Sequence, residues 1–141
     1  MPDILLEVPV SASPERVYEA ITKQQGLSNW WTPDVSGDAE VGHSVQFRFP
    51  GGYAVGMETV ALEPGRRLQW IVREGSPDWI GTDVTWDLTR VGDRTRVRFA
   101  QRNFSSTEGS FPYAAWNWAW YLTSLKAYLE TGKGKPGQLP V

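Results

Sequence analysis

The first 31 residues change from strand-like to helix-like hydrophobic patterning within a few positions. Residues 4–10 are mostly apolar and partly β-branched, which predicts a strand. Ser13 then fits an N-cap, and Pro14 fits the first position of a helix. Apolar residues recur at three- and four-residue spacing up to Ile21, which predicts a helix with one buried face. We expect Gly26 to end this helix or the turn after it.

The middle of the chain has the two-residue period of β-structure. Residues 44–49 alternate strictly between polar and apolar, which predicts a strand with one apolar face. The Pro-Gly-Gly sequence at residues 50–52 is typical of a turn, so a partner strand should begin near Tyr53. The apolar positions change phase between residues 53 and 63, which indicates a β-bulge or a bend. Residues 67–72 predict a further amphipathic strand.

Residues 82–102 predict a β-hairpin whose register can be assigned. Gly92-Asp93 is a two-residue turn with glycine first, which is typical of a type II′ turn. The register that this turn implies collects apolar side chains on one face and opposite charges on the other, and a slip of one residue would separate both sets. The expected inward pairs are Val84–Gln101, Trp86–Phe99 and Leu88–Val97, and the expected outward ion pairs are Asp83–Arg102 and Asp87–Arg98.

The last third of the chain predicts one long helix between two irregular segments. Residues 103–111 read as a loop, rich in Ser and Gly, that is a candidate gate. Residues 112–130 predict a helix with Trp118, Leu122, Leu125 and Leu129 on one stripe. Gly and Lys residues follow residue 131 and favour a helix end. We therefore expect one domain over residues 1–132 and a flexible tail over residues 133–141.

Composition narrows the class of protein. The 141 residues carry 14 basic and 16 acidic side chains, a net charge of -2, which gives no general attraction to nucleic acid. Cysteine is absent, so a disulfide framework and a thiol nucleophile are excluded. The sequence shows no signal peptide and no run long enough to span a bilayer, and we expect a cytoplasmic protein without membrane insertion. The unusual feature is the aromatic content, with 8 Trp, 5 Tyr and 5 Phe.

Few residues suit acid–base or metal chemistry. His43 is the only histidine, and its place beside a turn favours a structural or surface role over a catalytic one. A single His without Cys disfavours a Ser-His-Asp triad or a His-rich metal site. Glu58 is a candidate buried carboxylate if it points inward, and Asp78 is a loop residue that could sit at a cavity mouth. We predict no catalytic residue, no metal and no cofactor.

Five local strings, in this order and spacing, resemble the START and pollen-allergen-like superfamily, often called SRPBCC. They are residues 12–22, 26–31, 62–70, 95–99 and 118–132. The most similar branch is that of the activator of heat-shock protein 90 ATPase-like proteins. The resemblance implies an α+β helix-grip fold, in which a curved antiparallel sheet wraps around a long C-terminal helix and two short helices lie near the N-terminus. Relatives include lipid and polyketide binders, cyclases and a chaperone-activating domain, so the fold alone does not choose the function.

Two positions depart from the pattern of the family. Gln101 stands where relatives often carry a His at the end of the last strand, and Asn117 stands where they often have Gly before the helix Trp. The first departure removes a titratable group from the expected cavity. It therefore argues against acid–base catalysis there.

The concave apolar surface between sheet and helix is our leading candidate site. We expect it to bind a small hydrophobic or aromatic molecule, with one or two hydrogen bonds to orient it. Gln101 is the first choice for that bond, and Thr59 and Tyr53 are further polar candidates. The alternative is that the tryptophans fill this space themselves. The predicted ligand-binding residues are Trp30, Trp31, Phe47, Phe49, Trp70, Trp86, Phe99, Gln101, Trp118 and Leu122.

A second candidate surface lies on the opposite side of the long helix. Tyr113, Trp116 and Trp120 occupy positions that should be polar on a one-sided helix, and aromatic clusters of this kind mark interfaces. This surface predicts a protein-interaction module, as a homodimer or by analogy with a chaperone-ATPase activator. Burial under neighbouring segments is the alternative. An enzyme of the cyclase or hydrolase type is the third hypothesis.

Overall fold

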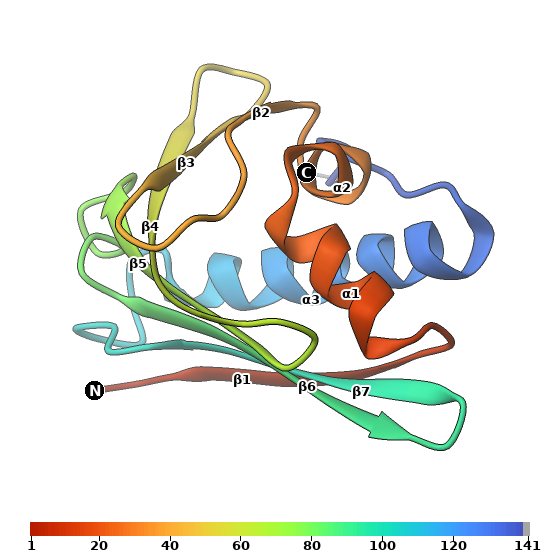
Figure 1. The fold of residues 1–141 in the computed structure, drawn as a ribbon. Helices are drawn as coiled ribbons and strands as arrows, with labels where there is room; N and C mark the ends of the chain where they lie inside the picture. The colour runs from red at the N-terminus through yellow and green to blue at the C-terminus, as the bar shows by residue number, and fades with distance from the viewer. Residues whose placement is uncertain (140–141) are drawn as a thin grey trace.

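The computed structural model describes residues 1–139, in which a curved sheet wraps around a long helix (Figure 1). Along the chain the elements are β1 (Ile4–Val10), α1 (Pro14–Thr22), α2 (Gln24–Trp30), β2 (Asp34–Ser36), β3 (Ser44–Arg48), β4 (Ala54–Glu63), β5 (Arg67–Glu74), β6 (Asp83–Val91), β7 (Arg94–Arg102) and α3 (Phe111–Thr131). Within these described residues the sheet has seven antiparallel strands in the order β1-β7-β6-β5-β4-β3-β2. The helices lie on one side of the sheet, with α3 along its concave face. The predicted α+β helix-grip fold is confirmed.

The N-terminal helices form as two separate elements that pack closely on each other. Ser13 caps α1, because its Oγ accepts a hydrogen bond from the amide of Arg16 at 3.2 Å. Gly26 lies inside α2 rather than ending a helix, so that prediction was wrong. A Cβ at this position would lie 2.6 Å from the Cα of Ala20. The glycine is therefore needed for close helix packing rather than for chain reversal.

The strands in the middle of the chain follow the predicted pattern. Val45 and Phe47 of β3 are fully buried. Irregular register in β4 against β5, between Gly56 and Met57 and again between Thr59 and Ala61, confirms the predicted bulge. Bulges bend a strand and increase its twist, which suits a sheet that curls around a helix.

The predicted register of the β6–β7 hairpin is confirmed. Val84 lies opposite Gln101, Trp86 opposite Phe99, and Leu88 opposite Val97. Gly92 has φ of 65°, the left-handed value that the first position of this turn requires. The turn and the two-residue period were sufficient to fix this pairing.

The predicted ion pairs across that hairpin were wrong. Asp87 pairs with Arg67 of β5 at 2.7 Å, and Arg98 pairs with Glu7 of β1 at 2.8 Å. Each pair joins residues directly opposite on the neighbouring strands that flank the hairpin. The hairpin residues Asp83 and Arg102 instead hydrogen bond to Gln69 and Thr85. The predicted register of the two strands is thus right, but Asp87 and Arg98 form their ion pairs with residues of the neighbouring strands β5 and β1.

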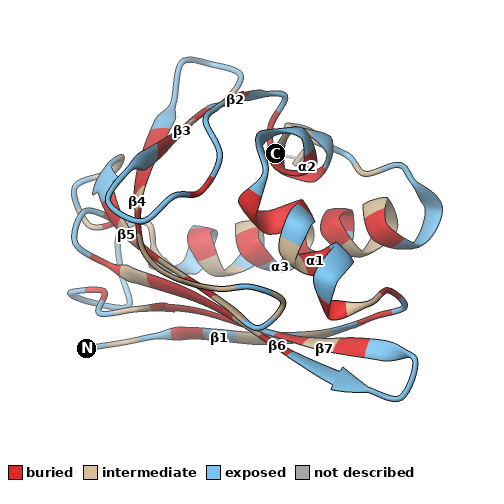
Figure 2. Ribbon diagram, in the orientation of Figure 1, coloured by how far each residue is buried: buried red, intermediate tan, exposed pale blue. Residues whose placement is uncertain are grey.

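Helix α3 extends one residue beyond each predicted end and stops at Gly132, which has φ of 85°. Its buried stripe contains Trp118, Leu122, Leu125 and Leu129, as predicted. Figure 2 shows buried residues on the inner faces of the sheet and helices and exposed residues on the outside. Among the described residues, no helix combines the length and apolar character needed to cross a membrane.

Candidate functional site

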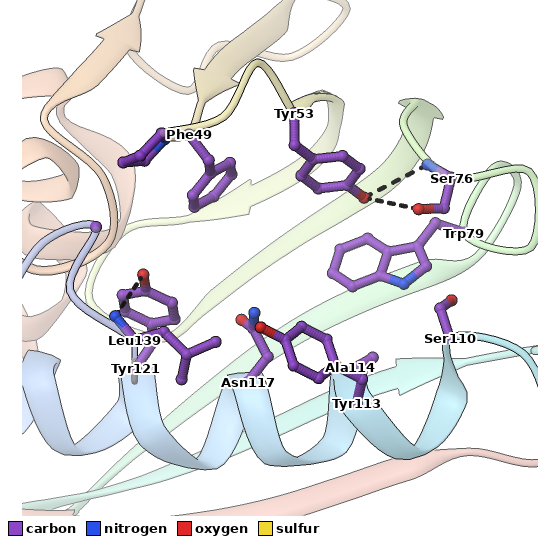
Figure 3. Close-up of a pocket in the computed structure, with 12 residues that line it drawn as sticks. Phe49, Tyr53, Ser76, Trp79, Ser110, Tyr113, Ala114, Asn117, Tyr121 and Leu139 are labelled. Atoms are coloured by element: carbon purple, nitrogen blue, oxygen red, sulfur yellow. Dashed lines mark hydrogen bonds between the residues drawn. The ribbon is translucent and has the colours of Figure 1, made fainter. Parts of the chain in front are cut away.

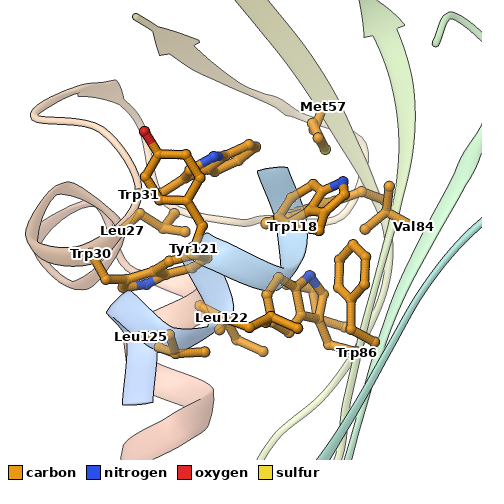
Figure 4. Close-up of a cluster of buried hydrophobic side chains, with 14 of the residues drawn as sticks. Leu27, Trp30, Trp31, Met57, Val84, Trp86, Trp118, Tyr121, Leu122 and Leu125 are labelled. Atoms are coloured by element: carbon orange, nitrogen blue, oxygen red, sulfur yellow. The ribbon is translucent and has the colours of Figure 1, made fainter. Parts of the chain in front are cut away.

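Most of the predicted ligand-binding side chains form one packed aromatic cluster inside the sheet. Figure 4 shows part of it around α3. The five tryptophans Trp30, Trp31, Trp70, Trp86 and Trp118 are each at most 1% exposed. Their rings pack against one another. The ring centroids of Trp31 and Trp118 are 4.8 Å apart, and those of Trp86 and Trp118 are 6.1 Å apart in an edge-to-face arrangement. Such contacts leave these ring faces covered by protein, as in an ordinary core.

Gln101, the predicted hydrogen-bonding group for a ligand, is bonded within the protein. Its Oε1 accepts from the indole Nε1 of Trp118 at 2.8 Å, and its Nε2 donates to Thr82 Oγ1 at 2.9 Å. Thr82 Oγ1 in turn donates to the carbonyl of Trp79 at 2.6 Å. The chain of bonds satisfies a fully buried amide and links the cluster to the β5–β6 loop.

Several polar atoms inside the same cluster have no partner among the described residues. They are the indole nitrogens of Trp31, Trp70 and Trp86 and the hydroxyl of Thr59. Thr59 and Trp70 lie opposite each other on β4 and β5. Buried donors in proteins nearly always have a hydrogen-bond acceptor. The interior is therefore tightly packed but contains polar groups whose hydrogen-bonding capacity is not used within the described residues.

A pocket of about 420 Å³ opens beside the cluster, where four segments meet (Figure 3). Helix α3, the β3–β4 turn, the β5–β6 loop and the C-terminal segment each contribute a wall. The lining residues are Phe49, Pro50, Tyr53, Ser76, Trp79, Ser110, Tyr113, Ala114, Asn117, Tyr121, Gly137 and Leu139. Of the ten residues predicted to bind a ligand, Phe49 is the one that lines this pocket of the described chain.

The other predicted residues lie behind the pocket wall or deeper in the core. Trp79 stacks on Trp118 at 6.2 Å, and Phe49 contacts Trp31 at 5.5 Å. The sequence alone had marked Phe49 and Tyr53, and had noted Asn117 only as a departure from the family. Of the remaining lining residues, Tyr113, Ala114 and Tyr121 come from α3. The others come from loops and from the C-terminal segment, whose positions no periodic pattern specifies.

The pocket is aromatic and carries no charged side chain among its described lining residues. Five rings surround it, and polar atoms occur at a few points only. The Asn117 amide has no hydrogen-bond partner within residues 1–139, whereas Tyr53 Oη and Ser76 Oγ bond to each other at 3.1 Å. Burial raises the pKa of Tyr121, whose hydroxyl stays neutral at ordinary pH. These features suit an uncharged ligand.

Asp78 fastens one end of the pocket. Its carboxylate accepts bonds from Ser110 Oγ at 2.7 Å and from the Ser110 amide at 2.9 Å, at the N-terminus of α3. These two bonds lower the pKa of Asp78 below its ordinary value. A Cβ on Gly109, which has φ of +64°, would approach the carboxylate to 2.8 Å. Asp78 therefore lies beside the pocket and holds the β5–β6 loop against the helix.

The other groups considered for acid–base chemistry lie outside the pocket. Glu58 pairs with Arg73 at 2.9 Å on the outer face of the sheet, so it does not point inward. His43 is exposed and lies 3.7 Å from Glu40. Within the described part of the chain, no group of three or more His, Cys, Asp or Glu residues is placed to hold a metal ion.

The predicted gate is attached at both ends. Phe104, near its start, is 1% exposed, and its amide donates to the carbonyl of Pro2 at 3.2 Å. Ser110, at its end, is held by Asp78. Gating by this loop stays a prediction.

The predicted interface residues lie on the outer side of α3. Tyr113 and Trp116 are 48% and 44% exposed, and their rings meet edge-to-face at 5.8 Å. Trp120 is half-buried and packs on Tyr121. Tyr113 also lines the pocket, so the exposed cluster and the pocket share a border.

Comparison with known proteins assigns the family. Residues 11–130 match the family model described as Activator of Hsp90 ATPase homolog 1-like protein. The chain belongs to this family. It is similar to the Aha1 dimer from Colwellia psychrerythraea, with 37% identity and a TM-score of 0.89, covering 95% of this chain and 100% of that one.

Two further solved structures, with lower sequence identity, share the fold of this chain. The protein CV1439 from Chromobacterium violaceum is 26% identical with a TM-score of 0.75, covering 91% of this chain and 96% of that one. DynU16, from the dynemicin biosynthetic locus, is 25% identical with a TM-score of 0.80, covering 94% of this chain and 48% of that one. No curated protein matches the chain.

Proposed function

We propose that this protein binds a small, uncharged aromatic molecule in the pocket between α3 and the β5–β6 loop. The observation that carries the proposal is the lining itself: five aromatic residues, no charged side chain among the described lining residues, and the amide of Asn117. Aromatic walls supply apolar burial, and a single amide orients a hydroxyl or carbonyl group of the ligand. The similarity to DynU16, a protein of a biosynthetic locus, is consistent with a small-molecule site.

The buried tryptophans act in this proposal as the support of the pocket rather than as its surface. Trp118 backs Trp79, and Trp31 backs Phe49, so the two pocket rings keep their positions through the core. In this proposal Trp31 and Trp118, which the sequence predicts as ligand contacts, act on the ligand indirectly by holding Phe49 and Trp79 in place. The unpartnered indole nitrogens behind the wall offer hydrogen bonds to a ligand group that penetrates further.

Fluorescence titration with N-phenyl-1-naphthylamine, a neutral aromatic probe, tests the proposal. The wild-type chain should bind it, and Asn117→Phe, which fills the pocket, should weaken binding by at least about tenfold, the equivalent of 1.4 kcal/mol. Ala119→Phe is the matched control, because Ala119 lies on the exposed side of the same helix. Equal binding by wild type and Asn117→Phe would place the probe elsewhere and reject the pocket.

A second candidate function is self-association through the exposed cluster of Tyr113, Trp116 and Trp120. Two of these rings are more than two-fifths exposed, and Trp and Tyr are favoured at interface centres. The relative from Colwellia psychrerythraea was solved as a dimer, which supports this candidate. Such a surface also suits the chaperone-activator role for which the family is named.

Sedimentation velocity distinguishes this candidate from simple surface exposure. The double variant Trp116→Gln, Trp120→Gln should shift a dimer to monomer while circular dichroism stays that of the wild type. A wild-type chain that is monomeric over the whole accessible concentration range would remove the homodimer. Loss of folded signal in Trp120→Gln alone would assign that half-buried ring to the core.

A further inference from the structure

The C-terminal segment, residues 133–139, leaves α3 and folds back over the side of the pocket. Three of its backbone amides donate hydrogen bonds to the body of the protein. The bonds are Lys135 N to Ser124 Oγ at 2.7 Å, Gly137 N to Trp31 O at 2.7 Å and Leu139 N to Tyr121 Oη at 3.4 Å. Ser124 is itself buried and donates to the carbonyl of Trp30, so the first bond joins the segment to both α2 and α3.

The glycines of this segment match its path. A Cβ on Gly134 would lie 2.4 Å from the carbonyl oxygen of Asn29, a distance that no side chain tolerates. Gly137 has φ of +67°, and a Cβ there would meet Pro33 at 3.3 Å and Pro50 at 3.6 Å. The residues that suggested flexibility in the sequence thus permit a close approach between the segment and the body.

Leu139 closes one end of the pocket. Figure 3 shows it beside Tyr121, while Ser110 and Trp79 lie at the opposite end. From Ser110 to Tyr121 the pocket follows α3 for roughly 16 Å, at 1.5 Å per residue. Leu139 is half-buried against the hydrophobic core, so its side chain is a wall rather than a solvent-facing group.

The segment lies outside residues 11–130, the part of the chain that matches the family model. The wall at this end of the pocket is therefore supplied by residues beyond the matched region. We propose that residues 133–139 form a specificity-determining wall and that Leu139 limits the length of the aromatic molecule that the pocket accepts. This inference rests on the proposed function.

Two neutral probes of different length test the inference: 2-naphthol and the longer N-phenyl-1-naphthylamine. Leu139→Trp should shorten the pocket and weaken binding of the longer probe by at least about tenfold, because that probe would lose buried apolar surface. Binding of the shorter probe, which does not reach Leu139, should change by less than about twofold. Leu139→Ala should shift the ratio of the two dissociation constants in the opposite direction. Gln138→Trp is the matched control, because it adds the same ring at an exposed neighbouring position.

The outcomes separate this inference from the proposed function. Binding of both probes with the same ratio in wild type, Leu139→Trp and Gln138→Trp overturns the inference and leaves the pocket in place. Failure of the wild-type chain to bind either probe overturns both.

A measurement on the wild-type chain guards against misfolded variants. Hydrogen exchange of the Gly137 amide, which bonds to Trp31 O, should slow several-fold when N-phenyl-1-naphthylamine binds, because the ligand holds the segment in place. Unchanged exchange at saturating probe overturns the inference.

Discussion

The aromatic residues of this protein occupy two regions that differ in how their rings are covered. In the interior, Trp31, Trp86 and Trp118 are enclosed by other rings and are at most 1% exposed. Around the pocket, Tyr53 and Tyr113 present one face to open space and are 40% and 48% exposed. Trp86 and Trp118 come from a strand and a helix, and Trp31 caps the end of α2, whereas the pocket rings come partly from turns and loops. The same residue type therefore stabilises the fold in one region and offers a binding surface in the other.

Removing an interior ring should have the largest effect. Trp86→Ala should lower the free energy of unfolding by about 3–5 kcal/mol, because it leaves a cavity among packed rings. Urea denaturation measures the change. Trp116→Ala, which removes an exposed ring of the same size, is the control and should cost less than about 1 kcal/mol. Similar losses in the two variants would contradict the division into core and surface rings.

Removing the buried amide of Gln101, which links the interior rings to the pocket wall through hydrogen bonds, should have the second largest effect on stability. Gln101→Leu removes the acceptor of the Trp118 indole and should cost about 1–3 kcal/mol, the penalty for an unsatisfied buried donor. It should also weaken probe binding, because Thr82 no longer receives the bond that helps to position the carbonyl of Trp79. Gln69→Leu on the outer face is the control. An equal loss of stability with unchanged probe affinity in both variants would break the proposed link.

The loop contact at the pocket mouth should contribute less and should depend on pH. The pKa of Asp78 is lower in the folded chain than its ordinary value of 3.8, so its stabilising contribution is complete above that value and is lost as pH falls through the folded pKa. Asp78→Asn should reduce stability at neutral pH by about 1 kcal/mol, as for other groups at helix N-termini.

Thermal unfolding at about pH 6 and at successively lower pH compares the two chains as Asp78 becomes protonated. The difference between wild type and Asp78→Asn should shrink as the carboxylate is protonated. A constant difference over the whole range would assign the effect of the substitution to packing rather than charge.

The ion pairs on the outer face of the sheet should have the smallest effect. Arg67 and Asp87 are 32% and 45% exposed, so Arg67→Gln should change stability by about 0–1 kcal/mol. It should leave probe affinity unchanged, since the pair lies on the side of the sheet away from the pocket. Denaturation at low and at high salt concentration measures how much of the change in stability comes from the electrostatic attraction between the two side chains, which salt screens. A loss above about 2 kcal/mol would show that this face contributes to stability as the interior does.

The family match and the local elements were accessible from the sequence because each depends on neighbouring residues. The β6–β7 register followed from a two-residue turn and a two-residue period, and the α3 stripe from helical spacing. The predicted ligand site was harder to place, since large inward-facing rings indicate burial equally well whether they line a cavity or fill it. The structure shows that Trp70 and Trp118 pack against other aromatic rings, while Phe49 and Trp79 line the pocket and contact Trp31 and Trp118 of the cluster.

The sequence by itself indicated most of the strands and helices and their buried faces, because hydrophobic periodicity and turn residues act over a few positions, and its resemblance to the family implied the fold. The tertiary structure alone decided the partners of Asp87 and Arg98, the role of Gly26 as a helix contact, and the pocket wall at Leu139. Each of these depends on segments far apart in the chain coming within contact distance. Such encounters are fixed by the packing of the whole molecule, which no local pattern records.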